Sequence, residues 1–326
     1  MGMYYDAWWL AFENETRGPV LSFYRAALVA AVTGSLVLGI GVLTFWPAAL
    51  SGLGTPIRHL AGIGNSHTTV TVTHTRIASV PVTAPGPNNT GWRHTGVHLT
   101  QAACGANGEL LIDTDGATID SALIQCNVRV NANNVTISRS LVAAGGPWAI
   151  YKPDAYTNLK VTDVEINGRP GCQAAIAFSH YTATRVNIHG CQDGVRIDAD
   201  STLQDSWIHN FWDGTQNGQR IDEPNHDGVS TTGGSNLTIR HNRIDNPHSN
   251  NSCIAIGGVY AEPSNVLIED NYLDGGNYSV LLAPYGNNRV IKDNTFTRNF
   301  LTGPVNLAGS YAWSGNVYTD GSPVPG

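Results

Sequence analysis

Two segments of the chain share an Asp-Gly-Val sequence that is suited to acid–base chemistry. They are Asp193-Gly-Val195 and Asp227-Gly-Val229, and His226 stands directly before the second aspartate. If the two segments form neighbouring strands, the carboxyl groups become adjacent, and their repulsion raises one pKa. A carboxyl group with a raised pKa can act as a general acid. The residues expected to carry catalysis are Asp193, Asp227, His226 and Arg196, with Arg220 and Glu223 from the segment that lies between the two motifs.

That segment, residues 209–226, is long and irregular, and it carries aromatic and charged side chains. Aromatic rings stack on the apolar faces of sugars, so these residues favour a carbohydrate substrate. The residues expected to contact substrate are Trp212, Asp213, Tyr151, Lys152, His189, His209 and Tyr260.

The motifs leave the reaction open. In a β-elimination, a cation neutralises the uronate carboxylate while a base removes the neighbouring proton, and Asp193 with Asp227 would then be Ca²⁺ ligands. In a hydrolysis, one carboxyl protonates the leaving oxygen and another activates water or attacks the sugar. A purely structural role is equally compatible, because Asp-Gly pairs are common in turns. No zinc-type spacing, phosphate loop or nucleophile elbow is present.

The elements that would position these residues form a repeat. Segments such as Leu237-Thr-Ile-Arg-His-Asn242 and Val266-Leu-Ile-Glu-Asp-Asn271 recur at intervals of roughly 23 to 29 residues. A second short apolar motif, such as Cys253-Ile-Ala-Ile256, lies between successive copies. Two short strands per repeat leave no room for a helix, and each repeat needs a stacked neighbour to bury its apolar face. The pattern therefore predicts an all-β solenoid.

With these repeats, the chain resembles the right-handed parallel β-helix proteins of the pectate-lyase-like superfamily over about residues 100–320. It is most similar to uncharacterised secreted β-helix proteins of actinobacteria and their phages. The resemblance implies a single-stranded right-handed parallel β-helix and a ladder of stacked asparagines at Asn242, Asn271, Asn294 and Asn316. The Trp-Ile-Asp-His pattern of pectate lyases and the Asp-Asp and Gly-His-Gly elements of polygalacturonases are absent.

Composition and cysteine spacing restrict the class of protein. The 326 residues are 41% hydrophobic and only 13% charged, and they include 36 glycines, which fits a turn-rich β protein. A net charge of −7 argues against nucleic acid as a partner. The chain has five cysteines. Stacking of successive repeats would bring four of them together as two pairs, Cys104 with Cys126 and Cys172 with Cys191. Disulfides would place the domain outside the cytoplasm, whereas Cys253 has no evident partner.

The N-terminal region predicts a different environment. Residues 26–46 are uncharged and apolar over a length that can cross a bilayer as a helix. A cleaved signal peptide and a helix buried by partner chains in a larger assembly, such as a phage tail, are the alternatives. The expected organisation is an N-terminal segment (1–25), this hydrophobic helix (26–46), a Thr/Pro/Gly-rich linker (47–95) and the β-helix (96–326).

These observations favour an extracytoplasmic protein, anchored to a membrane or to an assembly, that binds and cleaves a surface polysaccharide. It would act as a lyase or a hydrolase, with Ca²⁺ as the only cofactor that the motifs suggest. The rival hypothesis is a non-catalytic carbohydrate-binding or structural module, such as a phage tail or receptor-binding protein. The expected location is a membrane anchor with the C-terminal domain outside the cytoplasm, and a secreted protein or a virion tail is the alternative.

Overall fold

The computed structural model describes residues 83–326 except 217, 221–225 and 248–250. The N-terminal segment, the predicted hydrophobic helix and most of the predicted linker lie outside the described residues. None of the helices within the described part is long and apolar enough to cross a membrane.

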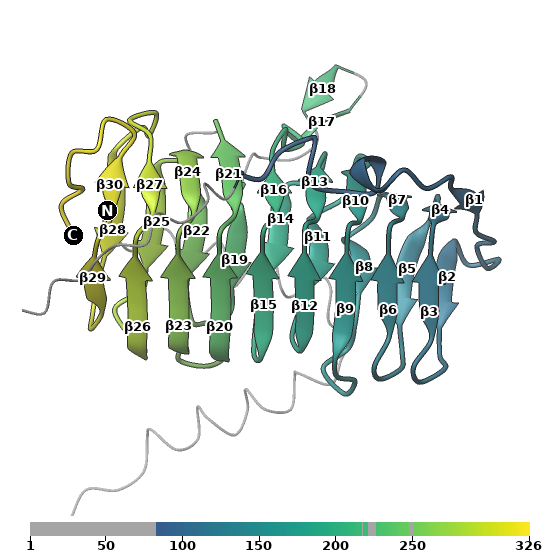
Figure 1. The fold of residues 1–326 in the computed structure, drawn as a ribbon. Helices are drawn as coiled ribbons and strands as arrows, with labels where there is room; N and C mark the ends of the chain where they lie inside the picture. Colours follow the sequence, from purple (N-terminus) through teal and green to yellow (C-terminus); the bar gives the residue numbers. More distant parts are fainter. Residues whose placement is uncertain (1–82, 217, 221–225, 248–250) are drawn as a thin grey trace, which may run out of the picture. The chain divides into compact units, whose positions relative to one another are not determined.

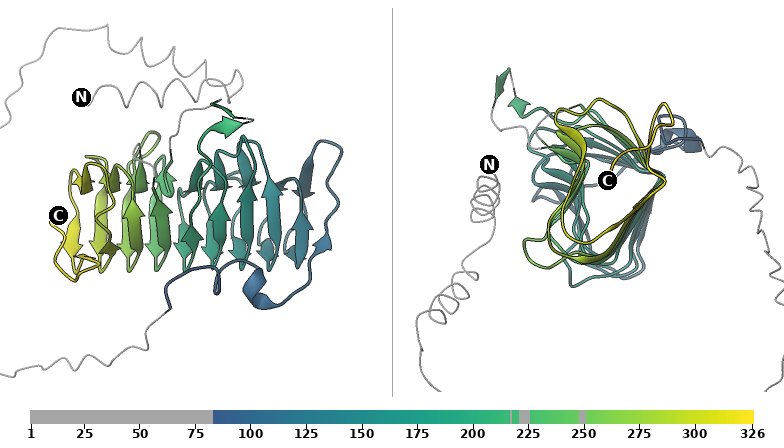
Figure 2. Two further views of the ribbon diagram at one scale, coloured as in Figure 1. Left: turned by 90° about the horizontal axis from the view of Figure 1, so that it is seen from above. Right: turned by 90° about the vertical axis from the view of Figure 1, so that its left-hand side faces the viewer.

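The described chain winds through three parallel sheets, called A, B and C here, and visits each sheet once in every coil (Figures 1 and 2). Sheet A has ten strands and sheets B and C have nine each. The chain is therefore a parallel β-helix, and the all-β solenoid predicted from the repeats is confirmed.

The strands of sheet A follow each other in chain order. They are β1 (Thr100–Gln101), β4 (Ala122–Ile124), β7 (Leu141–Ala144), β10 (Glu165–Gly168), β13 (Asn187–His189), β16 (Trp207–Ile208), β21 (Arg243–Asn246), β24 (Tyr272–Gly275), β27 (Thr295–Phe296) and β30 (Val317–Tyr318).

Sheets B and C are built in the same order. Sheet B contains β2 (Glu109–Ile112), β5 (Asn127–Val130), β8 (Trp148–Tyr151), β11 (Ala174–Ala177), β14 (Asp193–Arg196), β19 (Val229–Thr231), β22 (Ser252–Ile256), β25 (Tyr278–Leu282) and β28 (Gly303–Leu307). Sheet C contains β3 (Thr118–Asp120), β6 (Thr136–Ser138), β9 (Leu159–Thr162), β12 (Tyr181–Thr184), β15 (Ser201–Gln204), β20 (Ser235–Arg240), β23 (Ser264–Glu269), β26 (Asn287–Lys292) and β29 (Ala312–Ser314).

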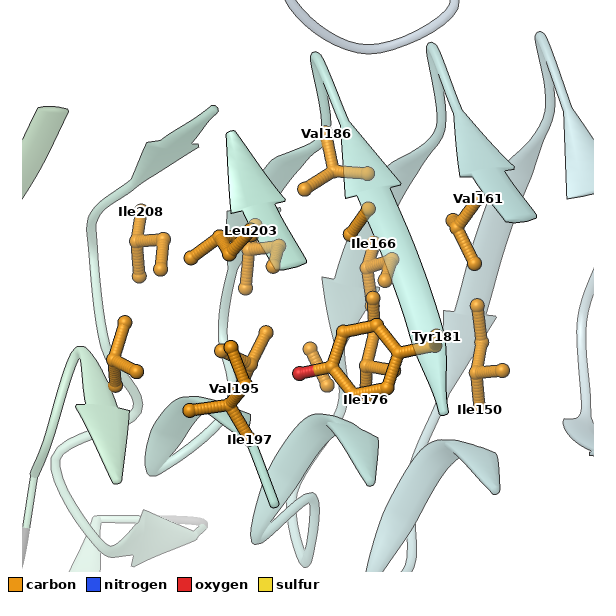
Figure 3. Close-up of a cluster of buried hydrophobic side chains, with 14 of the residues drawn as sticks. Ile150, Val161, Ile166, Ile176, Tyr181, Val186, Val195, Ile197, Leu203 and Ile208 are labelled. Atoms are coloured by element: carbon orange, nitrogen blue, oxygen red, sulfur yellow. The ribbon is translucent and has the colours of Figure 1, made fainter. Parts of the chain in front are cut away.

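The core lies between the three sheets and consists of stacked aliphatic side chains. Each sheet contributes stacked core side chains from successive coils, and Figure 3 shows part of this cluster. Ile166, Ile188 and Ile208 come from sheet A and are all buried. Burial of one such side chain stabilises the fold by about 1.5–3 kcal/mol. The core therefore holds each coil on the next and fixes which residues point outward.

The asparagine ladder that the family resemblance implied is confirmed. The side-chain oxygen of Asn271 accepts hydrogen bonds from the backbone and the side chain of Asn242, at 3.0 Å each. Its amide group donates to the Ile239 carbonyl at 2.9 Å and to Asn294 at 2.9 Å. Asn294 makes the equivalent contacts with Asn316. The ladder thus satisfies buried backbone groups at the corner between sheets C and A.

Both predicted disulfides are present. Cys104 is bonded to Cys126, and Cys172 is bonded to Cys191. Each bond joins two successive coils at the corner between sheets A and B, while Cys253 is buried and not disulfide-bonded. Two disulfides indicate an oxidising, extracytoplasmic compartment.

The segment that precedes the first strand lies against sheet A. The amide of Gly91 donates to the Arg185 carbonyl at 2.8 Å, and Arg93, in the short 3-10 helix η2 (Arg93–Thr95), forms an ion pair with Glu165 at 2.9 Å. His94 lies 3.0 Å from the Asp163 carboxylate. Residues 83–95, the described end of the predicted linker, are therefore part of the folded domain.

The ladder gives a test of how coils are held together. We expect Asn271→Ala to lower the free energy of unfolding by at least about 2 kcal/mol, because it leaves buried donors and acceptors without partners. Chemical denaturation measures this change. The matched control is Asn288→Gly, which removes only an exposed amide contact to Asn265 and keeps the left-handed backbone of that turn. Equal losses in the two variants would contradict a special role of the buried ladder.

Candidate functional site

The two Asp-Gly-Val motifs lie next to each other at the start of the sheet B strands. Val195 and Val229 are register partners, and the backbone amide of Asp227 donates to Asp193 Oδ1 at 3.1 Å. A Cβ on Gly194 would lie 2.3 Å from the Gly228 carbonyl oxygen, so the glycines let successive coils approach closely here. The first motif thus lies within β14, whereas in the second motif Asp227 and Gly228 directly precede β19.

The two carboxyl groups point away from the core but are buried. Asp193 is 5% exposed and Asp227 is 3% exposed. The oxygens of Asp227 accept hydrogen bonds from the Ser252 amide at 2.9 Å and from the Asn251 side chain at 3.1 Å. Each carboxyl group therefore binds a backbone amide of the next coil, as expected for a structural ladder.

Burial also changes the acidity of the pair. Burial raises the pKa of Asp193 above its ordinary value, although the Arg196 guanidinium opposes the shift. The pKa of Asp227 is raised by burial and then by the neighbouring Asp193 carboxylate. Raised pKa values keep part of the pair protonated in the neutral range, where a protonated carboxyl can donate a proton.

Arg196 and His226 complete this cluster. Arg196 Nε lies 3.7 Å from Asp193 Oδ2. His226 is fully buried and lies 3.0 Å from the Gln192 carbonyl oxygen, through Nδ1. That contact needs a proton on Nδ1, because a carbonyl only accepts. His226 is therefore held by the backbone of the preceding coil.

The Asp193–Asp227 pair has few oxygen atoms left that could bind a calcium ion. Ca²⁺ takes six to eight oxygen ligands, whereas the oxygens of Asp193 and Asp227 already accept hydrogen bonds or face Arg196. Among the residues that the structure describes, no three His, Cys, Asp or Glu side chains are grouped so that they could hold a metal. The carboxyl groups of Asp193 and Asp227 are thus already engaged by the protein and do not fit a calcium site.

Two predicted substrate-binding residues follow each other in the chain but have different surroundings: Tyr151 ends β8 and Lys152 comes directly after it. Tyr151 points outward and stacks on Trp148, with ring centroids 4.8 Å apart. Lys152 is fully buried, and its amino group donates to the Pro153 and Tyr156 carbonyls at 3.1 and 2.7 Å. Burial lowers the pKa of Lys152 to about 8. This lysine closes a turn and does not face a ligand.

The two predicted substrate-binding histidines lie on a different sheet. His189 ends β13 in sheet A and lies 3.3 Å from Glu165, and His209 follows β16 and stacks on Trp207 at 3.5 Å. The His189 and His209 rings are 5.3 Å apart. They therefore belong to the outer face of sheet A and not to the Asp193–Asp227 cluster.

The long irregular segment forms a small antiparallel hairpin, β17 (Thr215–Gln216) and β18 (Gln219–Arg220), separate from the three sheets (Figure 1). Trp212 donates through its ring nitrogen to the Thr215 carbonyl at 2.8 Å, and Asp213 accepts from the Thr215 amide at 2.9 Å. The side chain of Arg220 and all of Glu223 lie outside the described residues. Tyr260 is half exposed and follows β22, whereas the aspartates stand where sheet B strands start.

The sequence interpretation missed an aromatic cluster on the outer face of sheet B. Trp148 and Tyr151 stack with an angle of 26° between their planes, and Phe178 packs edge-on against both rings. The Arg129 guanidinium lies 5.5 Å from the Tyr151 ring centroid. We call Arg129, Trp148, Tyr151 and Phe178 the aromatic platform. The residues come from three coils, so only the register of the strands shows their proximity.

The platform and the carboxyl pair belong to the same two rows of side chains. Trp148, Ala174 and Asp193 are successive register partners. In the second row Tyr151 pairs with Ala177, and Arg196 lies in the next coil. Parallel strands are about 4.8 Å apart, so Arg129 and Arg196 lie roughly 14 Å from each other along this row. Sheet B thus presents two cationic side chains with aromatic rings between them.

The raised pKa values of the carboxyl pair predict a pH-dependent stability. At pH values between the usual pKa of Asp, about 4, and the raised pKa values of the folded pair, folding takes up protons. The stability that this contributes is fully present below the usual value and is lost as pH rises through the raised pKa. We therefore expect the free energy of unfolding to fall from pH 4 towards pH 8, by up to about 1.4 kcal/mol per pH unit for each proton.

Urea denaturation across this pH range measures the effect. The double variant Asp193→Asn and Asp227→Asn should show a shallower decline, because amide groups do not titrate. An identical pH profile in both proteins would show that the pair does not titrate in this range.

Comparison with known proteins supports the fold and gives no assigned activity. Residues 174–323 match a protein family described as a right-handed beta helix region. No curated protein and no solved structure matches the chain. The fold is common among carbohydrate-active proteins, but a fold alone does not specify an activity. Over the matched residues, the chain is a right-handed parallel β-helix, as the family resemblance implied.

Proposed function

We propose that the protein binds an acidic polysaccharide outside the cytoplasm, along the outer face of sheet B. The observation that carries this proposal is the aromatic platform, with Arg129 at one end and Arg196 farther along the same row. Trp148 and Tyr151 offer a flat, partly exposed pair of rings. Stacked rings bind sugar faces, and guanidinium groups pair with carboxylates.

The geometry matches a linear polymer better than a small ligand. The rows follow the long axis of the solenoid, so equivalent positions recur about every 4.8 Å. A sugar chain lying along these rows would place one ring on the platform and its acidic groups towards Arg129 and Arg196. The carboxyl pair supports this arrangement, because its raised pKa values reduce the negative charge beside Arg196.

Cleavage of the same polymer is a second candidate function. The observation that favours it is the raised pKa of Asp227, since a protonated carboxyl near a bound sugar can protonate a leaving oxygen. The hydrogen bonds from Ser252 and Asn251 instead favour a structural role for this residue. Binding without cleavage, as in a structural or tail-associated module, agrees with those contacts.

Removing the platform tests the binding proposal. We expect Trp148→Ala in the full-length protein to weaken binding of polygalacturonate about tenfold, which corresponds to about 1.4 kcal/mol. The physical reason is the loss of the stacking surface. Titration calorimetry or biolayer interferometry measures the affinity. The matched control is Tyr285→Ala, which removes an exposed aromatic ring elsewhere. Wild-type affinity in Trp148→Ala would rule out the platform as the binding surface.

A product assay tests the catalytic candidate. If the pair catalyses cleavage, the wild-type protein should release reducing ends or unsaturated sugars from an acidic polysaccharide, and Asp227→Asn should reduce the rate at least a hundredfold. The amide keeps an oxygen for the Ser252 amide, so the fold is expected to persist. Tight binding with no product from the wild-type protein would assign the pair to the scaffold.

A further inference from the structure

The outer face of sheet A carries a second group of polar and aromatic side chains that the proposed function does not use. They extend from β16 to the residue after β27. Arg243 pairs in register with Trp207 on one side and with Tyr272 on the other. Asp245 pairs with Asp274 in the parallel row, which Thr297 continues. We call Trp207, Arg243, Asp245, Tyr272, Asp274 and Thr297 the sheet A strip.

Contacts within the sheet A strip hold the side chains of Trp207, Arg243 and Asp245 in place. Asp245 Oδ2 accepts from the Trp207 ring nitrogen at 2.8 Å and from Arg243 Nε at 2.9 Å. The Arg243 guanidinium lies 5.7 Å from the Trp207 ring centroid and 5.6 Å from that of Tyr272. This arginine is therefore held at Nε, while its side chain stays 40% exposed.

The same strip keeps hydrogen-bonding groups available. Within the described part of the chain, the terminal nitrogens of Arg243 and the hydroxyl of Tyr272 have no hydrogen-bond partner. Asp274 uses one oxygen for the Thr297 hydroxyl, at 2.7 Å. Donors on Arg243 and an acceptor on Asp274 thus stand on adjacent coils. A sugar hydroxyl can both donate and accept a hydrogen bond, so of two neighbouring hydroxyl groups one can accept from Arg243 and the other can donate to Asp274.

The charge of the strip differs from that of sheet B. Asp245 forms an ion pair with Arg243, whereas Asp274 interacts with Arg243 only at longer range and forms no ion pair with any described residue. Burial raises the pKa of Tyr272, and the Asp274 carboxylate raises it further, against the smaller opposing effect of Arg243. An anionic sugar would be repelled at this surface, whereas an uncharged one would not.

We propose that the sheet A strip is a second glycan-binding site, which takes uncharged, hydroxyl-rich sugars and works independently of sheet B. The inference rests on the proposed function only in treating the protein as a glycan binder. A chain with both sites would bind two chemically different segments of glycan on two faces of one solenoid.

An oligosaccharide array tests this inference with the full-length protein. The probes are linear neutral oligomers of glucose, mannose and galactose, with oligogalacturonates beside them. We expect the wild-type protein to bind at least one neutral oligomer. Tyr272→Phe and Asp274→Ala should weaken that binding at least fivefold and leave oligogalacturonate binding unchanged. Trp148→Ala should show the reverse pattern.

The outcomes separate the two sites. Absence of neutral-sugar binding by the wild-type protein would overturn the inference. So would unchanged neutral-sugar binding in the Tyr272→Phe and Asp274→Ala double variant. Tyr272→Phe removes a single oxygen and keeps the ring, which protects the test against misfolding. Neutral binding that depends on the strip, without any oligogalacturonate binding, would support the inference and count against the proposed function alone.

Discussion

Parallel pairing between successive coils is the constraint on which every other feature depends. Each strand pairs with the equivalent strand of the next coil, and the same spacing places one side chain above another in columns. Inward columns form the aliphatic core. At the corner between sheets C and A, the buried asparagines satisfy backbone groups that this pairing leaves open. Outward columns then become continuous surfaces, which no single coil could provide.

The same constraint explains why the chain separates its charges by face. Sheet B has Arg129 and Arg196 in one outward row, with stacked aromatic rings between them. Sheet A instead pairs Arg243 with Asp245 and adds Asp274. Because a register position repeats in every coil, a substitution at an exposed, outward position changes one step of a column and keeps the buried core. The two faces can therefore acquire different ligand preferences on one scaffold.

The sequence predicted the features that follow from the spacing of the repeats. It did not predict which outward side chains are buried by other coils, or where the in–out alternation within a strand is broken. The solenoid, both disulfides and the adjacency of Asp193 and Asp227 follow from the spacing of copies. The burial of that pair does not, because Asn251 and Ser252 contribute to it from a coil that the motif does not contain. The stacking of Trp148 on Tyr151 was also hidden, since two successive buried residues, Ala149 and Ile150, break the simple alternation of inward and outward side chains in β8.

The central claim is that acidic sugars bind on the outer face of sheet B, and a crystal structure with a bound oligogalacturonate tests it most directly. We expect a sugar ring against the Trp148 and Tyr151 rings, with a carboxylate of the ligand at hydrogen-bonding distance from Arg129 or Arg196. A ligand found only on sheet A, or only beside the β17–β18 hairpin, would contradict it.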